Sequence, residues 1–366
     1  MKLRYKVLNG VLGLLVLAIA GLAVTIGYTA PCKPAPEGPS AGVEMRAIVY
    51  RCYGSPEVLA LEDVEKPVPV GSEVLVKVQA ASVNPLDWHY MRGSPYFMRL
   101  ALGIGAPSDH RLGVDFAGTV EAVGDKVTLF KPGDEVFGGR TGAFAEYVLV
   151  VEDRSIVHIP PGVSFEQAAS LPIAALTALQ ALRDKGVLQP GQKVLINGAS
   201  GGVGTFAVQI AKSMGAEVHG VCSTRNVELV RSIGADRVFD YKKEDYTQSG
   251  EAYDLIVDMV GNHSISKNRG VLKADGRYVM VGGPSGNWIA PLKRPIAAML
   301  TGPFVDQELI LLLARLDRND LVDVAKRVQD GDVRPVIDRR FSLDEVPAAI
   351  VYSESGRARG KILIEF

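Results

Sequence analysis

The stretch "NGASGGVGTFAVQIAKSMGAEVHGVCSTRN", residues 197–226, decides the fold. The apolar run "KVLIN" ends at Asn197 and is typical of a buried strand, and a glycine-rich turn follows it. Beyond the turn, apolar residues at helical spacing predict one buried helix stripe: Val203, Phe206, Ala207, Ile210, Ala211 and Met214. A second run, "EVHGVC", predicts the next strand. Strand, turn, helix and strand in this order predict a nucleotide-binding unit of a parallel sheet.

The glycine-rich turn predicts where a dinucleotide places its pyrophosphate. Three glycines allow a tight turn, close approach of a phosphate and close packing of the helix on the sheet. The free N–H groups and the positive end of the helix dipole then face the phosphate. The pattern has Ala199 in place of its first glycine. The residues expected to contact the cofactor here are Ala199, Ser200, Gly201, Gly202, Val203 and Gly204.

The end of the second strand predicts which dinucleotide binds. Units that bind NAD carry an acid there for the ribose 2′-hydroxyl, whereas this sequence reads Ser223, Thr224, Arg225. Two hydroxyls and a guanidinium suit the 2′-phosphate of NADP, which a carboxylate would repel. We therefore predict NADP(H); in the alternative, Arg225 only begins a solvated helix. Tyr241, after the following strand, is a further candidate for the adenosine side, or it is a half-buried turn aromatic.

The rest of the chain predicts an α/β protein with two folded lobes, because 366 residues exceed what one ordinary core supports. Residues 45–170 read as short strands broken by Gly and Pro, which is typical of a compact β-barrel. Residues 171–325 alternate helices with apolar strands and predict a doubly wound parallel sheet. Residues 326–366 return to strand-like runs, so we expect them to rejoin the first lobe.

Charge and cysteine content exclude several functions. With 40 basic and 41 acidic residues, no net field attracts nucleic acid. Cys32, Cys52 and Cys222 are too few and too scattered for a disulfide framework or a four-thiolate zinc lobe. We interpret them as isolated free thiols.

Residues 1–27 predict a membrane anchor or signal segment. No charge occurs from Val7 to Cys32, and a helix of that length spans a bilayer. The run exceeds a typical secretory core, and Pro31 disfavours cleavage after Ala30, so an uncleaved single-pass N-terminal transmembrane helix is favoured over a signal peptide. Residues 28–44, rich in Pro, Ala and Gly, predict a semi-extended tether without packing.

The side of the membrane on which the folded part lies stays open. Lys2, Arg4 and Lys6 precede the apolar run and favour an internal N-terminus with the folded part outside. Reduced nicotinamide cofactors, in contrast, are found inside cells.

Five motifs occur in order between residues 45 and 366: "ASVNPLDWHYMRG", "LGVDFAGTVEAVG", "FKPGDEVFG", "GAFAEYV" and "INGASGGVGTFAVQIAKSMGAEV". They resemble the medium-chain dehydrogenase/reductase superfamily, above all its zinc-independent quinone oxidoreductase branch. The resemblance implies a GroES-like catalytic domain built from both ends of this region and a Rossmann domain inserted between them. It also implies an active site in the cleft and, as is common in such families, a homodimer.

The resemblance also addresses the metal. Zinc-dependent relatives hold the catalytic ion with a Cys and a His–Glu pair, where this sequence has Asn84 and Val114–Asp115. Catalytic zinc takes three protein ligands, and Val114 offers none. We therefore predict no metal. Without a Lewis acid the substrate must itself accept hydride readily, which favours a quinone or an α,β-unsaturated carbonyl.

Catalytic candidates lie in the motif "NPLDWHYMRG". Asn84 matches an Asn of the branch and would lie near the nicotinamide, or it caps the turn that follows. Asp87 matches an acid of the branch, or it pairs with Arg92. His89 or Tyr90 stands where a relative places an active-site Tyr and would donate a proton. A surface or packing role for His89 is an equally good interpretation.

Residues of the C-terminal third complete the predicted site. The resemblance implies main-chain contacts of Gly261 and Gly282 with the nicotinamide half. Three basic residues are interpreted as a solvated tail rather than a site for the adenosine phosphate: Arg357, Arg359 and Lys361. Residues 287–304 are basic and amphipathic, and an ordinary packing loop is favoured there over a surface that lies against the bilayer.

The leading interpretation is an NADPH-dependent, metal-free reductase of quinones or activated alkenes, tethered to a membrane by one N-terminal helix. Two alternatives stay open. One is an alcohol dehydrogenase with an unusual metal site, and the other is a membrane-associated NADPH-binding sensor without turnover.

Overall fold

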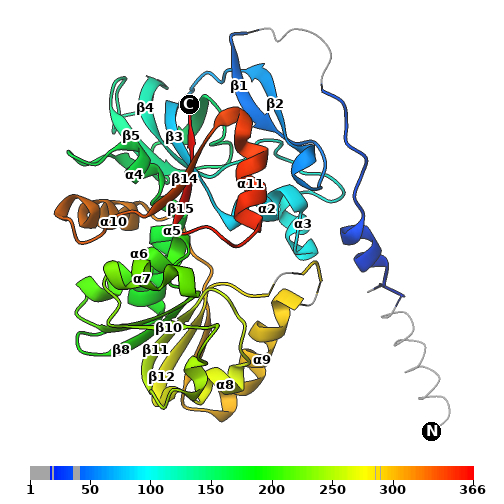
Figure 1. Cartoon of the computed structure of the whole chain (residues 1–366). Helices are drawn as coiled ribbons and strands as arrows, with labels where there is room; N and C mark the ends of the chain where they lie inside the picture. Colours follow the sequence, from blue (N-terminus) through cyan, green and yellow to red (C-terminus); the bar gives the residue numbers. More distant parts are fainter. Residues whose placement is uncertain (1–16, 19, 36–41, 285, 289) are drawn as a thin grey trace, which may run out of the picture.

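The computed structural model describes residues 17–18, 20–35, 42–284, 286–288 and 290–366, and it contains two lobes (Figure 1). A seven-stranded sheet forms the first, called the β lobe here, and a six-stranded parallel sheet forms the second, the Rossmann lobe. This architecture confirms the predicted α/β class with a GroES-like and a Rossmann domain.

The β lobe brings the two ends of the folded region together. The C-terminal strand β15 (Lys361–Glu365) pairs antiparallel with β3 (Glu73–Val83), so that Ile362 lies opposite Val83. In sheet order the strands are β14 (Ile337–Ser342), β15, β3, β4 (Asp115–Val123), β5 (Glu135–Gly139) and β7 (Ile156–His158), with β6 (Tyr147–Val151) beside β3. A separate antiparallel pair joins β1 (Glu44–Val49) and β2 (Ala60–Glu65). The helices along this part are α2 (Pro85–Arg92), α3 (Arg99–Leu102), α4 (Phe165–Ala169) and α11 (Val346–Glu354).

The Rossmann lobe contains a reversal of strand order. Its parallel strands lie in the order β10 (Arg237–Asp240), β9 (Glu217–Cys222), β8 (Lys193–Asn197), β11 (Tyr253–Asp258), β12 (Leu272–Met280) and β13 (Glu308–Leu311). Its helices are α5 (Pro172–Gln180), α6 (Gly202–Ser213), α7 (Val227–Ser232), α8 (Ile265–Arg269), α9 (Lys293–Thr301) and α10 (Arg318–Asp330). The order reverses between β8 and β11. In open parallel sheets, ligands bind beyond the carboxyl ends of the strands at such a reversal.

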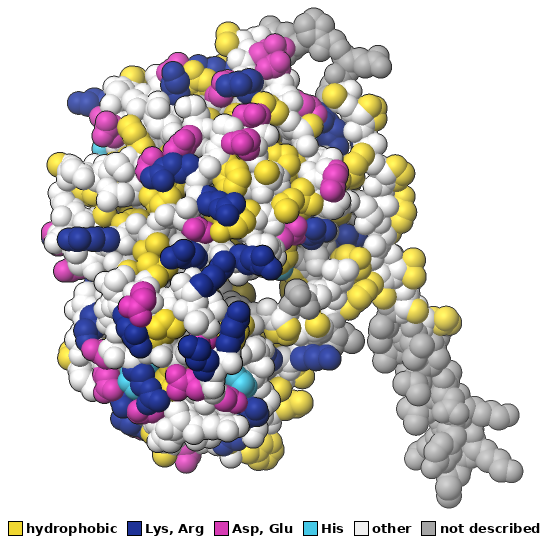
Figure 2. Space-filling model, viewed as in Figure 1, with side chains coloured by type: hydrophobic (Ala, Val, Ile, Leu, Met, Phe, Trp, Pro, Cys, Tyr) yellow, Lys and Arg dark blue, Asp and Glu magenta, His cyan; other side chains and the backbone are white. Residues whose placement is uncertain are grey.

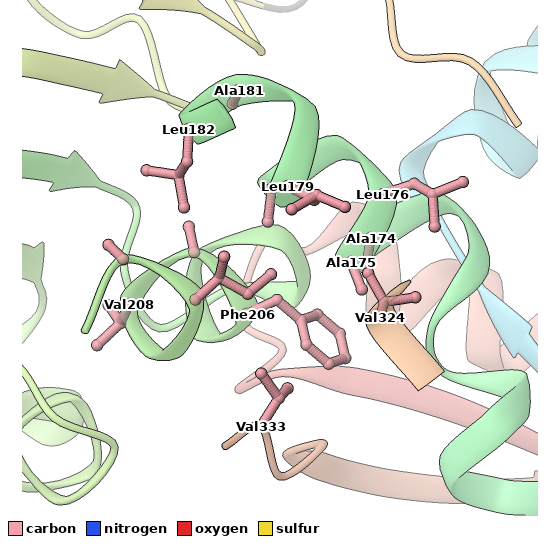
Figure 3. Packing of buried hydrophobic residues seen from close by; sticks show 14 of the residues in the cluster. Ala174, Ala175, Leu176, Leu179, Ala181, Leu182, Phe206, Val208, Val324 and Val333 are labelled. Atoms are coloured by element: carbon pink, nitrogen blue, oxygen red, sulfur yellow. The ribbon is translucent and has the colours of Figure 1, made fainter. Parts of the chain in front are cut away.

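The helical stripe predicted after the glycine-rich turn lies in the largest core of the described chain. Phe206 of α6 is fully buried and points toward α5 and α10, where Ala174, Ala175 and Val324 surround it (Figure 3). The small side chains of α5 let α6 approach closely. Because such interiors are close-packed, this contact fixes the start of α6 relative to the sheet.

The N-terminal part of the chain is described from residue 17. A helix, called the N-terminal helix here, covers residues 17–18 and 20–27. None of the helices within the described ranges has the length and apolar character needed to span a bilayer. Residues 1–16, which contain much of the predicted anchor, lie outside the described residues.

The start of the expected tether packs against the β lobe. Arg99 is only 2% exposed and donates hydrogen bonds to the carbonyl oxygens of Ile26, Gly27 and Tyr28. A cation at this place satisfies the last carbonyls of the N-terminal helix and complements its dipole. The helix is therefore held at its C-terminal end on the β lobe instead of being joined to it by a loose linker.

The interpretation of three free thiols is wrong for two of them, because Cys32 and Cys52 form a disulfide. The bond joins the N-terminal segment to the β lobe shortly after β1. A backbone hydrogen bond from Ala30 to Gly105 (2.8 Å) adds to the attachment. Cys222 is a free thiol, buried at the end of β9.

Candidate active site

The glycine-rich turn lies at the carboxyl end of β8, where the strand order reverses. Gly198 has a φ of 94°, in the left-handed region that favours glycine, so Gly198 makes the tight turn. Ala199 is fully buried in the core instead. A Cβ at position 204 would lie 2.1 Å from the Gly198 carbonyl oxygen, so Gly204 lets α6 start this close to the turn. Sequence reasoning missed Gly198, because the dinucleotide-binding pattern places its first glycine at position 199, one residue after Gly198.

The start of α6 fits an anion. Its N-cap residue is Gly201, which has no side chain to satisfy the first N–H groups of the helix. A Cβ at Gly201 or Gly202 would have no neighbour nearer than 3.4 Å, so these two glycines leave space beside the helix start. Exposed N–H groups, the helix dipole and this space are the features that hold a dinucleotide pyrophosphate. The turn therefore fits the predicted cofactor.

A buried charge cluster lies beside the turn at the end of β11. Asp258 is fully buried and accepts hydrogen bonds from Asn197 Nδ2 (2.9 Å), the Gly261 N–H (2.9 Å) and Arg294 Nη2 (2.5 Å). Arg294 also donates to the Gly282 carbonyl oxygen. The cluster thus holds Gly261 and Gly282, the predicted nicotinamide contacts, next to the end of β8. Sequence reasoning missed Asp258 and Arg294, since neither belongs to a motif.

A second buried cluster lies in the β lobe, where β3 ends and β4 and β15 begin. Lys361 is 2% exposed, and its Nζ donates to Asn84 Oδ1 at 2.6 Å and to Asp115 Oδ2 at 3.3 Å. Asn84 Nδ2 donates to the same Asp115 oxygen at 2.8 Å. Burial lowers the pKa of Lys361, and the attraction of Asp115 opposes that shift. The interpretation of Lys361 as part of a solvated tail is therefore wrong.

This second cluster adjoins the glycine-rich turn of the other lobe. The Gly360 N–H donates to the Ser200 carbonyl oxygen at 3.0 Å. A Cβ at Gly202 would contact Lys361 Cδ at 3.4 Å. The buried ammonium group thus comes from a side chain that passes directly beside the proposed pyrophosphate site, where the two lobes meet.

Asp87 closes the first turn of α2. It is fully buried and accepts a hydrogen bond from the Asn84 N–H at 2.7 Å, whereas Arg92 pairs with Glu354. The alternative of an Asp87–Arg92 pair is therefore wrong. Burial is the main cause that raises the pKa of Asp87 to about 8, and the charge of Asp115 adds to it. Asp87 consequently carries a proton at neutral pH.

His89 and Tyr90 are half-buried on α2 and differ in what they can donate. His89 Nδ1 lies 2.6 Å from the Ser94 carbonyl oxygen, which only accepts, so Nδ1 holds the proton of the neutral ring. Burial lowers the pKa of His89 and keeps the ring neutral. Burial and repulsion from Asp87 raise the pKa of Tyr90, so the phenol stays protonated. The His89 ring thus has its only proton engaged with Ser94, whereas Tyr90 keeps a hydroxyl proton, which makes Tyr90 the candidate for proton donation.

The predicted adenosine side lies at the ends of β9 and β10. Ser223 and Thr224 directly follow β9, and exposed Arg225 donates to the Arg357 carbonyl oxygen at 2.5 Å. Tyr241 follows β10 and is 56% exposed, so it is not a half-buried aromatic. Lys and Arg side chains gather along the boundary between the lobes on the face shown in Figure 2. The same carboxyl ends of the strands thus carry the glycine-rich turn and these residues.

The metal prediction receives no test from the fold. Across the described ranges, no group of three or more His, Cys, Asp and Glu side chains could hold a metal ion. Asn84 and Asp115, two of the positions that match zinc ligands, bind one another and Lys361 instead. The absence of zinc stays a prediction, as does each contact with the cofactor.

Comparisons with known proteins agree with this geometry. The family model for the alcohol dehydrogenase GroES-like domain matches residues 71–161, and that for zinc-binding dehydrogenase matches residues 233–364. The chloroplast envelope quinone oxidoreductase homolog of Arabidopsis thaliana is 35% identical over 345 residues, which cover 89% of this chain and 99% of that protein. The mitochondrial NAD(P)H oxidoreductase RTN4IP1 of Homo sapiens is 35% identical over an alignment of length 371, which covers 87% of this chain and 89% of that protein.

A solved structure shows the same arrangement of both lobes. The quinone oxidoreductase from Coxiella burnetii has a TM-score of 0.79 and 33% identity, with 88% of this chain and 100% of that chain covered. Matches of this identity and coverage extend over both lobes, including the glycine-rich turn of the Rossmann lobe. The chain is therefore an oxidoreductase of the medium-chain dehydrogenase/reductase superfamily and belongs to its quinone oxidoreductase-like branch.

Proposed function

We propose that this chain is an NADPH-dependent reductase of quinones or α,β-unsaturated carbonyls that works without a metal ion. The observation that carries the proposal is the buried cluster of Asn84, Asp115 and Lys361 beside the glycine-rich turn. A buried charge is costly to hold and is typical of a functional site. The printed names of the relatives, quinone oxidoreductases and an NAD(P)H oxidoreductase, support the same class of reaction.

Bound NADPH would supply the hydride, and the side chains of this chain have the other tasks. The start of α6 holds the pyrophosphate. The Lys361 ammonium provides positive charge that stabilises the negative charge developing on the acceptor oxygen. Asn84 and Asp115 keep that ammonium in place, because both accept hydrogen bonds from it. Tyr90 then donates a proton to the same oxygen.

Steady-state oxidation of NADPH by the purified full-length protein tests the reaction. A benzoquinone and an enone should be turned over at a rate that a chelator leaves unchanged, whereas a saturated alcohol with NADP⁺ should not react. Stoichiometric zinc together with brisk alcohol oxidation would instead establish the alcohol dehydrogenase alternative. Tight NADPH binding without turnover of any acceptor would establish the sensor.

The proton donor has its own test. Replacing Tyr90 with Phe removes the hydroxyl and should lower kcat for the enone by roughly 10²-fold, a common value for one general acid. His89→Gln keeps a similar size and should change kcat little. Equal losses in the two variants would contradict the assignment to Tyr90.

We also propose that the protein is a homodimer formed through β13. This strand is the last in its sheet within the described residues, so one edge of its backbone is unpaired there. Leu311 is 46% exposed and Leu313 is 78% exposed at this edge. An edge strand with apolar side chains is a natural place for pairing with a second chain. A homodimer is also what the resemblance to this branch implies.

A further inference from the structure

Helix α9 has its polarity inverted relative to an ordinary surface helix. Arg294 is 8% exposed and bonded to the fully buried Asp258, and Ala298 is also buried. The opposite face carries exposed apolar side chains, namely Leu292 (37%), Ile296 (43%), Met299 (69%) and Leu300 (64%), and Phe304 (86%) follows the helix. A helix against water buries its apolar stripe and exposes its charges. Residues 293–301 thus form a helix instead of the loop favoured for residues 287–304. The inner side of α9 packs on the Rossmann lobe, and its outer side suits apolar surroundings.

The N-terminal helix exposes apolar side chains in the same way. Leu17 is 69% exposed, Leu22 55% and Val24 74%. The end of this helix is fixed on the β lobe by Arg99 and by the disulfide that follows. Its direction relative to the folded lobes is thus set by contacts and not by a flexible linker.

A contact between aromatic side chains connects the N-terminal helix with the segment before α9. A Cβ at Gly27 would lie 3.0 Å from the Trp288 ring, and this ring packs edge-on against Tyr96 with centroids 4.8 Å apart. The Tyr96 N–H donates to the Asn287 carbonyl oxygen at 2.7 Å. Next to Tyr96, three further apolar side chains are exposed: Phe97 (43%), Leu100 (62%) and Ile104 (55%). Three distant parts of the chain therefore meet at one place (Figure 1).

We propose that these segments form one apolar face that lies in the interfacial layer of a lipid bilayer, which the N-terminal helix enters. The apolar face consists of Leu17, Leu22, Val24, Phe97, Leu100, Ile104, Ile296, Met299, Leu300 and Phe304. Lipid is the occupant because the N-terminal helix belongs, in the sequence, to the uncharged run from Val7 to Cys32, which has enough residues to span a bilayer as a helix. Trp288 and exposed Lys293 lie beside the face, and both residue types favour the boundary between lipid and water.

The apolar face has parts on both lobes. The segment with Leu100 belongs to the β lobe and α9 belongs to the Rossmann lobe. The segment with Leu100 follows α2, which carries Asp87 and Tyr90. The position of the face therefore places α2 near the layer in which lipid-soluble quinones dissolve. The relevance of this position to a quinone substrate rests on the proposed function. Binding of the face to lipid itself does not depend on the reaction.

Site-specific fluorescent labels on the full chain test the proposal. The native cysteines do not interfere, because Cys32 and Cys52 are bonded and Cys222 is buried. Leu300→Cys on α9 reports on the apolar face, and Val322→Cys is the matched control, an exposed apolar position on α10 (54%). Each variant carries an environment-sensitive nitrobenzoxadiazole label and is reconstituted into phosphatidylcholine/phosphatidylglycerol vesicles, with or without doxyl-labelled lipid.

The label at position 300 should shift its emission to the blue in vesicles and lose most of its fluorescence to doxyl lipid, because an interfacial helix is buried by about 5–10 Å. The label at position 322 should do neither. Adding Ile296→Ser, Met299→Ser and Phe304→Ser to the Leu300→Cys variant should abolish most of the quenching, while Arg294 still holds α9 in place. Equal quenching at positions 300 and 322 would overturn the proposal. A blue shift that grows with protein concentration in the absence of vesicles would overturn it too, by assigning the face to a second copy of the chain.

Discussion

At the residue scale, Asp87 is expected to make stability fall as pH rises. Burial raises its pKa in the folded chain from 3.8 to about 8, so the folded state keeps a proton that the unfolded state releases. The stabilising contribution is complete below about pH 4 and is lost as the pH rises toward 8. Asp87→Asn cannot ionise. It should reduce the difference in unfolding free energy between about pH 5 and pH 8 by more than about 1.4 kcal/mol, the value of one pKa unit.

Urea unfolding at both pH values measures this difference. Asp344→Asn is a suitable control, because it makes the same chemical change at an exposed position. An Asp87→Asn protein with the same pH dependence as the unchanged chain would show that Asp87 is ionised at neutral pH.

Arg225 carries the prediction about the dinucleotide. It is exposed at the end of β9, where Ser223 replaces the acid of NAD-binding units. A carboxylate at position 225 would repel the 2′-phosphate and lose a charged hydrogen bond worth about 1.5–3 kcal/mol. Arg225→Glu should therefore raise the KM for NADPH by roughly 10- to 150-fold and change the KM for NADH much less. Arg231→Glu on α7 serves as the control, and equal losses for the two cofactors in Arg225→Glu would refute the assignment.

At the element scale, the glycines of the turn divide into two kinds. Position 204 has no room for a Cβ, because the Gly198 carbonyl oxygen would lie 2.1 Å away, whereas a Cβ at Gly201 would meet its nearest neighbour at 3.5 Å. Gly204→Ala should cost about 1–3 kcal/mol of stability, as overpacking does. Gly201→Ala should cost less stability than Gly204→Ala and weaken NADPH binding, because its methyl group would fill space beside the helix start.

Thermal unfolding and cofactor titration of the two variants separate these effects. Gly302→Ala provides a control away from the turn, since a Cβ there would have no neighbour within 4 Å. A Gly204→Ala protein that melts like the unchanged chain would contradict the close approach of α6 to the turn.

The N-terminal helix shows how an element can be positioned from a distance. Its composition and that of the following residues predict a helix and then a loose tether. The partner that fixes the helix, Arg99, lies about 70 residues further along the chain, as the separations of 71 to 73 residues to its carbonyl acceptors show. Local composition carries no information about such a partner, and the same holds for the disulfide between Cys32 and Cys52.

At the scale of the whole molecule, the unpaired edge of β13 leads to a prediction about assembly. Leu313→Lys would place a charge in the proposed dimer interface, where it would be buried without a partner. The variant should therefore be monomeric under conditions in which the unchanged chain is a dimer, as light scattering coupled to size exclusion measures. Val351→Lys on α11 replaces another exposed apolar side chain (55%, against 78% for Leu313) and should leave the dimer intact. An unchanged mass for Leu313→Lys would exclude this edge as the interface.

The placement of the candidate site between two lobes also belongs to this scale. One buried cluster is built at the strand ends of the β lobe and the other at those of the Rossmann lobe. They come together because the C-terminal strand crosses back to β3 and passes the glycine-rich turn on its way. A substrate held between the lobes would therefore meet groups from both ends of the chain.

The sequence by itself determined the features that depend on neighbours along the chain. The period of apolar residues predicted the helix after the turn, and alternation of helices and strands predicted the parallel sheet. Glycine spacing located the turn that forms the candidate anion site, with the exception of Gly198. These features follow from backbone geometry and local burial, so a short window of residues is sufficient to recognise them.

Only the tertiary structure decided which charges are buried and what they bind. Lys361 looks like part of a basic tail, yet its partners Asn84 and Asp115 lie 277 and 246 residues earlier and remove it from water. Arg294 likewise turns inward to Asp258, 36 residues before it, and leaves the apolar side of α9 exposed. The physical reason is that burying a charge costs free energy unless a partner is present, and the return path of the chain decides whether that partner is there.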